Sequence, residues 1–270
     1  MNPNQALWEK GDFTRIAATM RESGEALVRS LGLTRGLKVL DLGCGDGTTA
    51  IPAAELGANM LGVDIAQNLV AAGNRRAEAQ GLRNLKFRHG DACELVELED
   101  QSFDRVLSIF GAMFAPKPFE VAKEMVRVTR PGGTIVMGNW IPGDPTLVAE
   151  ILRICSAYSP PPPAGFVSPM TWGRENDVTE RFAATGIART KIRCAKDDYT
   201  FDYAGTPQQF VAEFRSYYGP TMNAFDAAAQ SGRAAQLASE LEALFREHNR
   251  STDPARTRIT ATFLRVSVSV

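Results

Sequence analysis

The chain has 270 residues, of which 44% are hydrophobic and 23% are charged, so its composition excludes a disordered or fibrous protein. Lys and Arg (30) nearly balance Asp and Glu (31), which leaves a net charge of -1 and no strong field to attract a polyanion, so we do not expect nucleic acid as a partner. The four cysteines are widely scattered and no apolar run could span a membrane, so we expect a reduced, cytoplasmic protein without a metal site.

Helical and strand patterns alternate through the first half of the chain. Apolar residues recur at helical intervals over residues 13–31, which predicts an amphipathic helix or helix pair. Short apolar runs suited to buried strands then alternate with helical segments, which implies a parallel sheet with right-handed crossovers. The expected strands are 38–42, 60–64, 85–88, 103–108 and 134–137, and the expected helices are 48–56, 68–80 and 118–129, with a turn at 130–133.

The alternation stops after Trp140. An expected helix over 147–158 runs into Ser159 and four prolines, which must be extended. Strict alternation of β-branched residues over 259–270 predicts a final strand. Between these segments we expect helices at 175–184, 207–218 and 222–247, a strand near 187–194 and a second extended piece at 199–203.

The most specific motif follows the first expected strand and reads Asp41-Leu42-Gly43-Cys44-Gly45-Asp46-Gly47. Glycines let the chain turn tightly and bring backbone amides close to a ligand. A phosphate-binding P-loop would need a lysine before Thr48, and a dinucleotide-binding loop would need a glycine at that position. Both of these loops are therefore excluded, and a purely structural glycine turn is the remaining alternative.

The spacing of Asp41, Gly43, Gly45 and Gly47 resembles the acidic-x-Gly-x-Gly-x-Gly loop of the class I S-adenosylmethionine-dependent methyltransferases. The resemblance implies an α/β Rossmann-like fold, with a mostly parallel seven-stranded sheet whose last strand is antiparallel, plus helical lid elements. It also implies S-adenosylmethionine as the cofactor, with S-adenosylhomocysteine as its product. An acidic residue here suits the α-ammonium group of that cofactor, and Cys44 would contribute its backbone.

The resemblance extends over most of the chain. The sequence resembles a bacterial group of small-molecule methyltransferases that are related to those of quinone biosynthesis. The residues that carry this resemblance are Trp8, Gly11-Asp12, 108–116, 131–133, 160–163, Ser168-Pro169, Trp172-Gly173 and Tyr218-Gly219-Pro220. With the element order above, it predicts an N-terminal helical lid (1–36), a cofactor-binding core (37–140), a lid or connector (141–187), and the last two core strands (188–270), whose inserted helices at 207–249 cover the acceptor pocket.

Two further acidic residues follow strand ends beside the loop. Asp64 ends the second expected strand, where a carboxylate can accept both hydroxyls of a ribose, although it could instead cap the following helix. Ile65 would then lie against the adenine. In Gly90-Asp91-Ala92 the resemblance implies a carboxylate that receives the adenine amino group, with the Ala92 backbone near the ring. A loop Asp bonded to its own backbone is the alternative for Asp91.

Candidate acceptor residues lie at and beyond the fourth expected strand. Ser108, Ile109 and Phe110 should form the floor under the sulfonium and the start of the acceptor pocket. The Asn/Asp-Pro-Pro-Tyr/Phe motif, typical of enzymes acting on nucleobase amines or glutamine, is absent there and argues for another acceptor. Apolar candidates that could equally be core residues, and one charged candidate that could equally be solvated, are Met113, Phe114, Trp140, Phe166, Trp172 and Arg15.

The chemistry places few demands on catalytic residues. Methyl transfer from a sulfonium leaves a neutral thioether that needs no proton, so orientation and a dry site can supply most of the acceleration. A base is needed only for an acceptor that must lose a proton. Candidates, each with a structural alternative, are His89, Asp12, Tyr217 and Tyr218, while His248 is expected to be solvated. The sequence predicts methylation of a small aromatic or lipid-like molecule, or, as the alternative, a catalytically silent S-adenosylmethionine-binding or scaffold protein.

Overall fold

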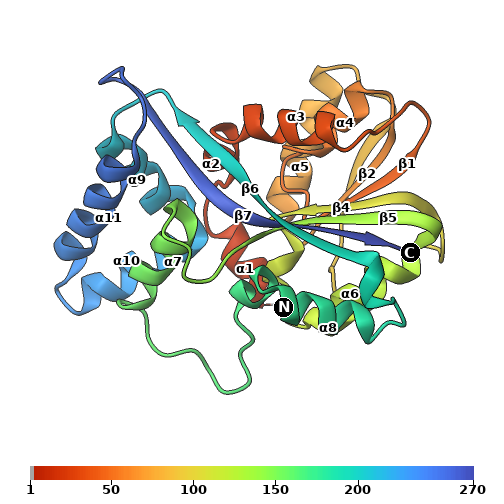
Figure 1. Cartoon of the computed structure of the whole chain (residues 1–270). Coiled ribbons are helices and arrows are strands. Elements are labelled where there is room, and N and C mark those ends of the chain that lie inside the picture. The colour runs from red at the N-terminus through yellow and green to blue at the C-terminus, as the bar shows by residue number, and fades with distance from the viewer. Residues whose placement is uncertain (1–2) are drawn as a thin grey trace.

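A seven-stranded sheet runs through the computed structural model, which describes residues 3–270 (Figure 1). The strands lie in the order β3-β2-β1-β4-β5-β7-β6. β7 pairs antiparallel with both of its neighbours, whereas the pairings among β1 to β5 are parallel, which confirms the expected sheet. The strands are β1 (Lys38–Leu42), β2 (Asn59–Asp64), β3 (Leu85–His89), β4 (Phe103–Ile109), β5 (Thr129–Trp140), β6 (Ile192–Tyr203) and β7 (Thr257–Ser269).

Burial explains why the central strands read as continuous apolar runs. Val39, Leu40 and Leu42 of β1 are at most 1% exposed, because helices cover both faces of the sheet there. β7 lies nearer the edge of the sheet, and its burial alternates along the strand as its sequence predicts. The carboxyl ends of β1, β2 and β4 therefore meet at one edge of a covered sheet.

Helices form two layers and a separate group (Figure 1). One face of the sheet carries α3 (Arg21–Ser30), α4 (Ala50–Glu55) and α5 (Gln67–Ala79), and the other carries α6 (Pro118–Val128) and α8 (Glu175–Ala183). The separate group lies at one end of β6 and β7 and contains α7 (Leu147–Ser156), α9 (Pro207–Tyr217), α10 (Gly219–Gln230) and α11 (Ala234–His248). No helix of the described residues is long and apolar enough to cross a membrane.

The N-terminal elements bridge these parts of the molecule. The helix pair expected over 13–31 is confirmed as α2 (Thr14–Ala18) and α3, and it is preceded by a short helix that was not expected, α1 (Pro3–Glu9). α1 contacts α5 and α10, and α2 contacts α9. Three short 3-10 helices complete the described structure: η1 (Ala112–Phe114), η2 (Pro169–Gly173) and η3 (Arg189–Lys191).

The strand expected near 187–194 begins only at Ile192 and continues without a break through the piece expected at 199–203, so the predicted start and the predicted break were wrong. β6 pairs with β7 in unbroken register from Ile192 opposite Val268 to Tyr203 opposite Thr257. The polar stretch that suggested a break is stabilised by cross-strand partners, since Asp197 pairs with Arg265 at 3.0 Å and the Thr262 hydroxyl donates to Asp198 at 2.9 Å.

The single helix expected over 222–247 was also wrong, because the chain forms α10 and α11 with a turn between them. Gly232 adopts φ +70° there, and the Arg233 amide donates back to the Ala228 carbonyl at 2.7 Å, as in a glycine-terminated helix. β5 likewise begins earlier than expected and includes 130–133, where its register with β4 shifts. The other expected elements are confirmed to within two residues at their ends.

Candidate cofactor and acceptor site

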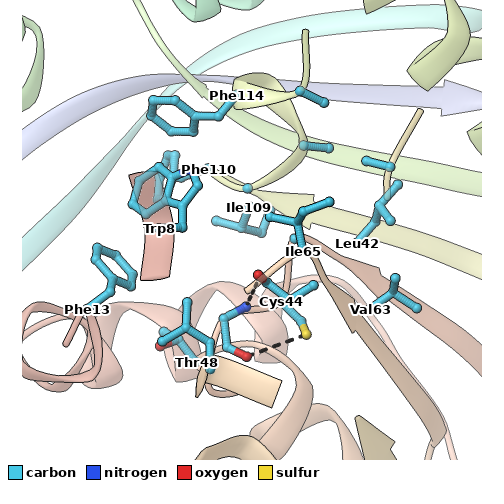
Figure 2. A pocket seen from close by; sticks show the side chains of 18 of the residues that line it. Trp8, Phe13, Leu42, Cys44, Thr48, Val63, Ile65, Ile109, Phe110 and Phe114 are labelled. Atoms are coloured by element: carbon cyan, nitrogen blue, oxygen red, sulfur yellow. Dashed lines mark hydrogen bonds between the residues drawn. The ribbon is translucent and has the colours of Figure 1, made fainter. Parts of the chain in front are cut away.

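A cavity lies at the carboxyl ends of β1, β2 and β4 (Figure 2). Its empty space is about 970 Å³, including the part open to solvent at its mouth. Ligands of open α/β sheets bind at the strand where the order reverses, which is β1 here because β2 and β4 flank it. The cavity is lined by Asn4, Trp8, Phe13, Ala17, Met20, Leu42, Gly43, Cys44, Gly45, Asp46, Thr48, Thr49, Val63, Asp64, Ile65, Leu69, Gly90, Asp91, Ala92, Ile109, Phe110, Gly111, Ala112, Phe114, Ala115, Pro116 and Tyr199.

The glycine loop is held against two neighbouring strands by its backbone. Gly43 and Cys44 donate their amides to the Val63 carbonyl of β2, at 2.7 and 3.2 Å. Gly43 adopts φ +70°, and a Cβ atom there would lie 2.6 Å from the Cα of Gly111, which follows β4. Because backbone meets backbone at this point, no side chain fits at Gly43 without displacing the floor of the cavity.

Asp64 fixes the opposite side of the loop. Its Oδ2 accepts the Gly45 amide at 2.8 Å, and its Oδ1 accepts the Ala66 amide at 2.9 Å. Burial raises the pKa of this carboxyl, while the two backbone hydrogen bonds oppose the increase. A carboxylate offers about four acceptor positions, so both oxygens keep capacity for hydroxyl donors from the cavity.

Asp41 is 1% exposed and lies beneath the loop at the end of β1. The Thr49 hydroxyl donates to its Oδ2, whereas its Oδ1 has no hydrogen-bond partner among the described residues. Burial, reinforced by the nearby Asp64, raises the pKa of Asp41 to about 7. An unpartnered buried carboxylate oxygen is unfavourable in the protein alone and suits a cationic donor brought by a ligand.

An ion pair attaches the N-terminal helices to the loop. Arg21 of α3 contacts both oxygens of the buried Asp46, with Nη1 at 3.1 Å and Nη2 at 2.5 Å, and its Nη1 also donates to the Thr48 hydroxyl at 3.0 Å. Arg76 of α5 lies 3.5 Å from the same carboxylate. Both arginines are thus committed to Asp46 and leave the cavity itself without a guanidinium.

Aromatic rings form the opposite wall of the cavity, on the left of Figure 2. Trp8 lies edge-on to Phe114 at 4.9 Å and to Phe13 at 5.5 Å between ring centroids. Tyr218 of the separate helical group supports Trp8 from behind at 5.9 Å. The wall therefore joins α1, the segment before α2, and η1, which are distant in sequence.

Phe110 connects this wall to the sheet. It adopts φ +61°, which is rare for a residue with a side chain and is sustained only by its surroundings. Its ring stacks on Trp140 at 3.7 Å and meets Tyr199 edge-on at 5.0 Å, while its amide donates to the Gly138 carbonyl at 2.9 Å. The strained backbone places an aromatic face at the end of β4, beside the loop.

Comparisons with known proteins agree with this geometry. Residues 40–137 match the family model described as "Methyltransferase domain". An uncharacterized protein of Mycobacterium tuberculosis (strain ATCC 25618 / H37Rv) is 34% identical over 250 residues, which cover 91% of this chain and 88% of the relative. A demethylmenaquinone methyltransferase of Geobacillus kaustophilus is 37% identical over 115 residues, or 42% of this chain and 49% of that enzyme.

A solved structure supports the fold over a longer stretch. Phosphoethanolamine N-methyltransferase 2 of Haemonchus contortus, in complex with S-adenosylhomocysteine, superposes with a TM-score of 0.58 at 20% identity, covering 92% of this chain and 52% of that one. The chain belongs to the class I S-adenosylmethionine-dependent methyltransferases. That Asp41 receives the ammonium and Asp64 the ribose hydroxyls of the methyl donor stays a prediction.

Most of the predicted cofactor residues line the cavity of this methyltransferase. They are Gly43, Cys44, Gly45, Asp64, Ile65, Gly90, Asp91, Ala92 and Ile109. Asp91 also serves its own loop, since its Oδ1 accepts the Cys93 amide at 2.8 Å. The Cys44 thiol is buried, which raises its pKa and keeps it protonated.

Three predicted cofactor residues stand behind the cavity wall. Besides Asp41, Gly47 adopts φ +93° and faces the Phe87 ring, which a Cβ atom would approach to 2.7 Å. The Ser108 hydroxyl donates to the Leu42 carbonyl at 2.7 Å and accepts the Ala112 amide at 2.9 Å, so it ties β4 to β1 and η1. The direct contact of these residues with a cofactor stays a prediction.

The predicted acceptor and catalytic residues are divided between the cavity and its surroundings. Phe110 and Phe114 line the cavity, and the following do not: Arg15, Met113, Trp140, Phe166, Trp172, His89, Asp12, Tyr217 and Tyr218. Arg15 pairs with Glu213 at 3.2 Å and lies over the Tyr217 ring, Met113 and Trp172 are buried in the core, and Phe166 is 54% exposed. Their proposed roles stay predictions, with no cavity contact to support them.

Sequence reasoning missed several lining residues. Phe13, Ala17 and Met20 share one helical face by their spacing of four and three, so periodicity could have indicated them. Trp8 entered only through the resemblance, and Tyr199 gave no signal because its cavity position depends on the course of β6. Among the described residues, no Lys, Arg or His lines the cavity and no cluster of His, Cys, Asp or Glu could hold a metal ion.

Proposed function

We propose that this methyltransferase transfers a methyl group to a small, uncharged acceptor with an aromatic or otherwise apolar body. One observation carries the proposal: a single cavity extends from its loop end, which is formed by the glycine loop and Asp64, to the wall of aromatic rings. A phosphate or carboxylate on the acceptor would meet Asp64 and Asp91 without a lining cation to neutralise it, since Arg21 and Arg76 are already paired with Asp46. A flat apolar acceptor instead gains contact area against the rings.

The residues of the chain would act mainly by holding and enclosing the reactants. S-adenosylmethionine, when bound, supplies a sulfonium methyl group whose transfer leaves a neutral thioether. Asp64 and the loop amides would orient the cofactor, and the wall formed by Trp8, Phe13 and Phe114 would position the acceptor and exclude water. No histidine lines the cavity within the described chain, so the proposal includes no histidine base.

We also propose that the predicted N-terminal lid, 1–36, covers the core at 37–140; its first two residues lie outside the described part of the chain. Glu9 of α1 accepts the Gln67 amide at the start of α5 at 2.9 Å, and this hydrogen bond lowers the pKa of Glu9. α1 is thus attached to the core by this charged contact, by the hydrogen bond from the Asn4 side chain to the Phe114 carbonyl, and by the packing of Trp8 on Phe114. In this proposal, 141–187 connects core and lid, and 188–270 supplies the last two strands, with the helices at 207–249 behind the wall.

A transfer assay tests the proposal directly. Purified protein, incubated with S-adenosylmethionine labelled in its methyl group, is offered neutral phenols, quinols and apolar amines, with phosphoethanolamine as the charged comparison. We expect label to reach a neutral aromatic or apolar acceptor and none to reach phosphoethanolamine. Methylation of phosphoethanolamine in preference to the neutral compounds would overturn the proposed acceptor class. Tight binding of S-adenosylhomocysteine without transfer to any member of a broad panel would favour the silent alternative.

A further inference from the structure

Tyr199 has a buried hydroxyl that the protein leaves unused. The residue lies in the second half of β6, is 1% exposed and lines the cavity, yet its Oη has no hydrogen-bond partner among the described residues. Buried polar atoms are nearly always paired, because an unpaired one loses its interaction with water and gains nothing in return. The hydroxyl is therefore available to a group that enters the cavity.

The course of β6 places this hydroxyl beside the glycine loop. The neighbouring Thr200 exchanges two hydrogen bonds with the Ser23 hydroxyl, at 2.9 and 3.0 Å, which attaches β6 to α3. A Cβ atom on Gly24 would lie 2.8 Å from the Tyr199 Oη and 2.7 Å from the Thr48 carbonyl oxygen. The hydroxyl and the Thr48 backbone therefore both pack against Gly24 of α3. The Tyr199 ring is held edge-on to Phe110, at 5.0 Å between ring centroids.

Two unpartnered buried polar atoms of opposite character thus occur at this end of the site, the Tyr199 hydroxyl in the cavity lining and the Asp41 Oδ1 behind the cavity wall. The Oδ1 of Asp41 can only accept hydrogen bonds when the carboxyl is ionised, whereas the Tyr199 hydroxyl can donate one. Burial, together with the nearby Asp41 carboxylate, raises the pKa of Tyr199, so the phenol keeps its proton at neutral pH. The charged neighbour Arg21 is committed to Asp46 and Thr48.

An amino-acid end has the matching pair of groups, since its ammonium donates and its carboxylate accepts. The described lining residues include no cation to receive that carboxylate, so neutral donors must do so. We propose that Tyr199 recognises the carboxylate of the cofactor's amino-acid end, while Asp41 receives the ammonium. This inference rests on the proposed function, because it takes S-adenosylmethionine as the methyl donor. Tyr199 is in this view a cofactor-specificity residue on a strand outside the glycine loop.

Three ligands that differ only in the amino-acid end test the proposal by calorimetric titration. They are S-adenosylhomocysteine, its decarboxylated analogue, which keeps the amine, and 5′-methylthioadenosine, which has neither group. We expect Tyr199→Phe to weaken S-adenosylhomocysteine binding about tenfold, the loss of a hydrogen bond to a charged group, and to leave the other two affinities unchanged. Asp41→Asn should weaken the two amine-containing ligands and spare 5′-methylthioadenosine.

The control and the contrary outcomes separate this proposal from the broader one. Tyr203→Phe removes a hydroxyl from the same strand, where the ring stacks on Phe210 outside the cavity, and should leave all three affinities unchanged. Equal weakening of all three ligands by Tyr199→Phe, or no weakening of any, would overturn the assignment. Wild-type protein that fails to bind S-adenosylhomocysteine would contradict the proposed function itself, whereas intact binding in Tyr199→Phe would contradict only this inference.

Discussion

The two ends of the cavity are built in different ways. The loop end comes from a compact stretch, 41–66, whose backbone amides and acids contact one another directly. The aromatic end gathers Trp8, Phe13 and Phe114 from segments that the fold alone brings together. The first end tolerates little change because backbone packs on backbone. The aromatic end consists of side chains, so substitutions there can change which acceptor binds while the loop end still binds the cofactor.

The largest expected effect tests the rigidity of the loop end. Gly43→Ala would force a Cβ atom to 2.6 Å from Gly111, whereas Gly45→Ala meets nothing within 4 Å and has only its φ of +56° to accommodate. We expect Gly43→Ala to weaken S-adenosylhomocysteine binding about 100-fold, a loss typical of misplaced site geometry. Gly45→Ala should cost about 1–2 kcal/mol of backbone strain. Calorimetric titration and thermal unfolding measure both variants, and equal behaviour of the two would contradict the contact argument.

The next effect concerns the charge at the loop end. Because the ammonium of the cofactor favours ionised Asp41, affinity for S-adenosylhomocysteine should fall as pH drops from 8 to 6, through the pKa of about 7. The decline approaches about tenfold per pH unit below that value. In Asp41→Asn we expect weaker binding and a shallower pH profile. A wild-type affinity that is constant over this range would show that Asp41 does not face the ammonium.

The same residue predicts a stability change in the ligand-free protein. Burial raises the pKa of Asp41 from 3.8 to about 7, so the folded chain holds a proton that the unfolded chain has lost between these values. The stabilising contribution is present below about pH 4 and is lost as pH rises through 7, because each pH unit in this window lowers the free energy of unfolding by about 1.4 kcal/mol. Asp41→Asn should therefore unfold at a higher temperature than the wild type at pH 8. At pH 4 the difference in unfolding temperature between Asp41→Asn and the wild type should become smaller or change sign.

A smaller effect separates the aromatic end from the loop end. Trp8→Ala removes a ring from the wall but leaves the glycine loop untouched. We expect the KM for the acceptor to rise about tenfold, as for the loss of one aromatic contact, while S-adenosylhomocysteine affinity stays within about twofold. Phe119→Ala, at an exposed ring on α6 outside the cavity, is the matched control. A parallel loss of cofactor affinity in Trp8→Ala would erase the distinction between the two ends.

The smallest effect concerns Cys44, which lies in the loop but is expected to act through its backbone. Among the described residues its thiol has one hydrogen-bond partner, the Gly45 carbonyl at 3.6 Å, and burial raises its pKa. Cys44→Ala should change S-adenosylhomocysteine affinity by less than about twofold, because no charge or strong hydrogen bond is lost. Iodoacetamide at pH 8 should likewise leave binding intact. A large loss from either treatment would assign the thiol a direct role.

The sequence predicts the loop end well because its signals are local. Asp41, Gly43, Gly45 and Asp64 each owe their position to a strand end and a turn, which composition and spacing reveal. The sheet follows for the same reason, apart from β6, where cross-strand ion pairs made a polar stretch part of a strand. At the aromatic end the sequence predicted Phe110 and Phe114, and the spacing of Phe13, Ala17 and Met20 could have added those three residues.

The position of Tyr199 in the cavity could not be predicted from the local sequence. Nothing in its neighbourhood distinguishes it from Tyr203, four residues later on the same strand. The hydrogen bonds between Thr200 and Ser23 attach this part of β6 to α3, and Tyr199 lines the cavity whereas Tyr203 does not. Such long-range placement is set by the whole fold, which explains why neither Tyr199 nor Trp8 could be found from motif spacing.

The most direct test of the central claim is calorimetric titration of the wild-type protein at pH 8 with S-adenosylhomocysteine and, separately, with NADH. The loop geometry predicts saturable binding of S-adenosylhomocysteine at one site per chain and no binding of NADH, since a pyrophosphate would meet buried carboxylates. Absence of heat with S-adenosylhomocysteine, or binding of NADH in its place, would contradict the claim that this cavity holds the methyl donor.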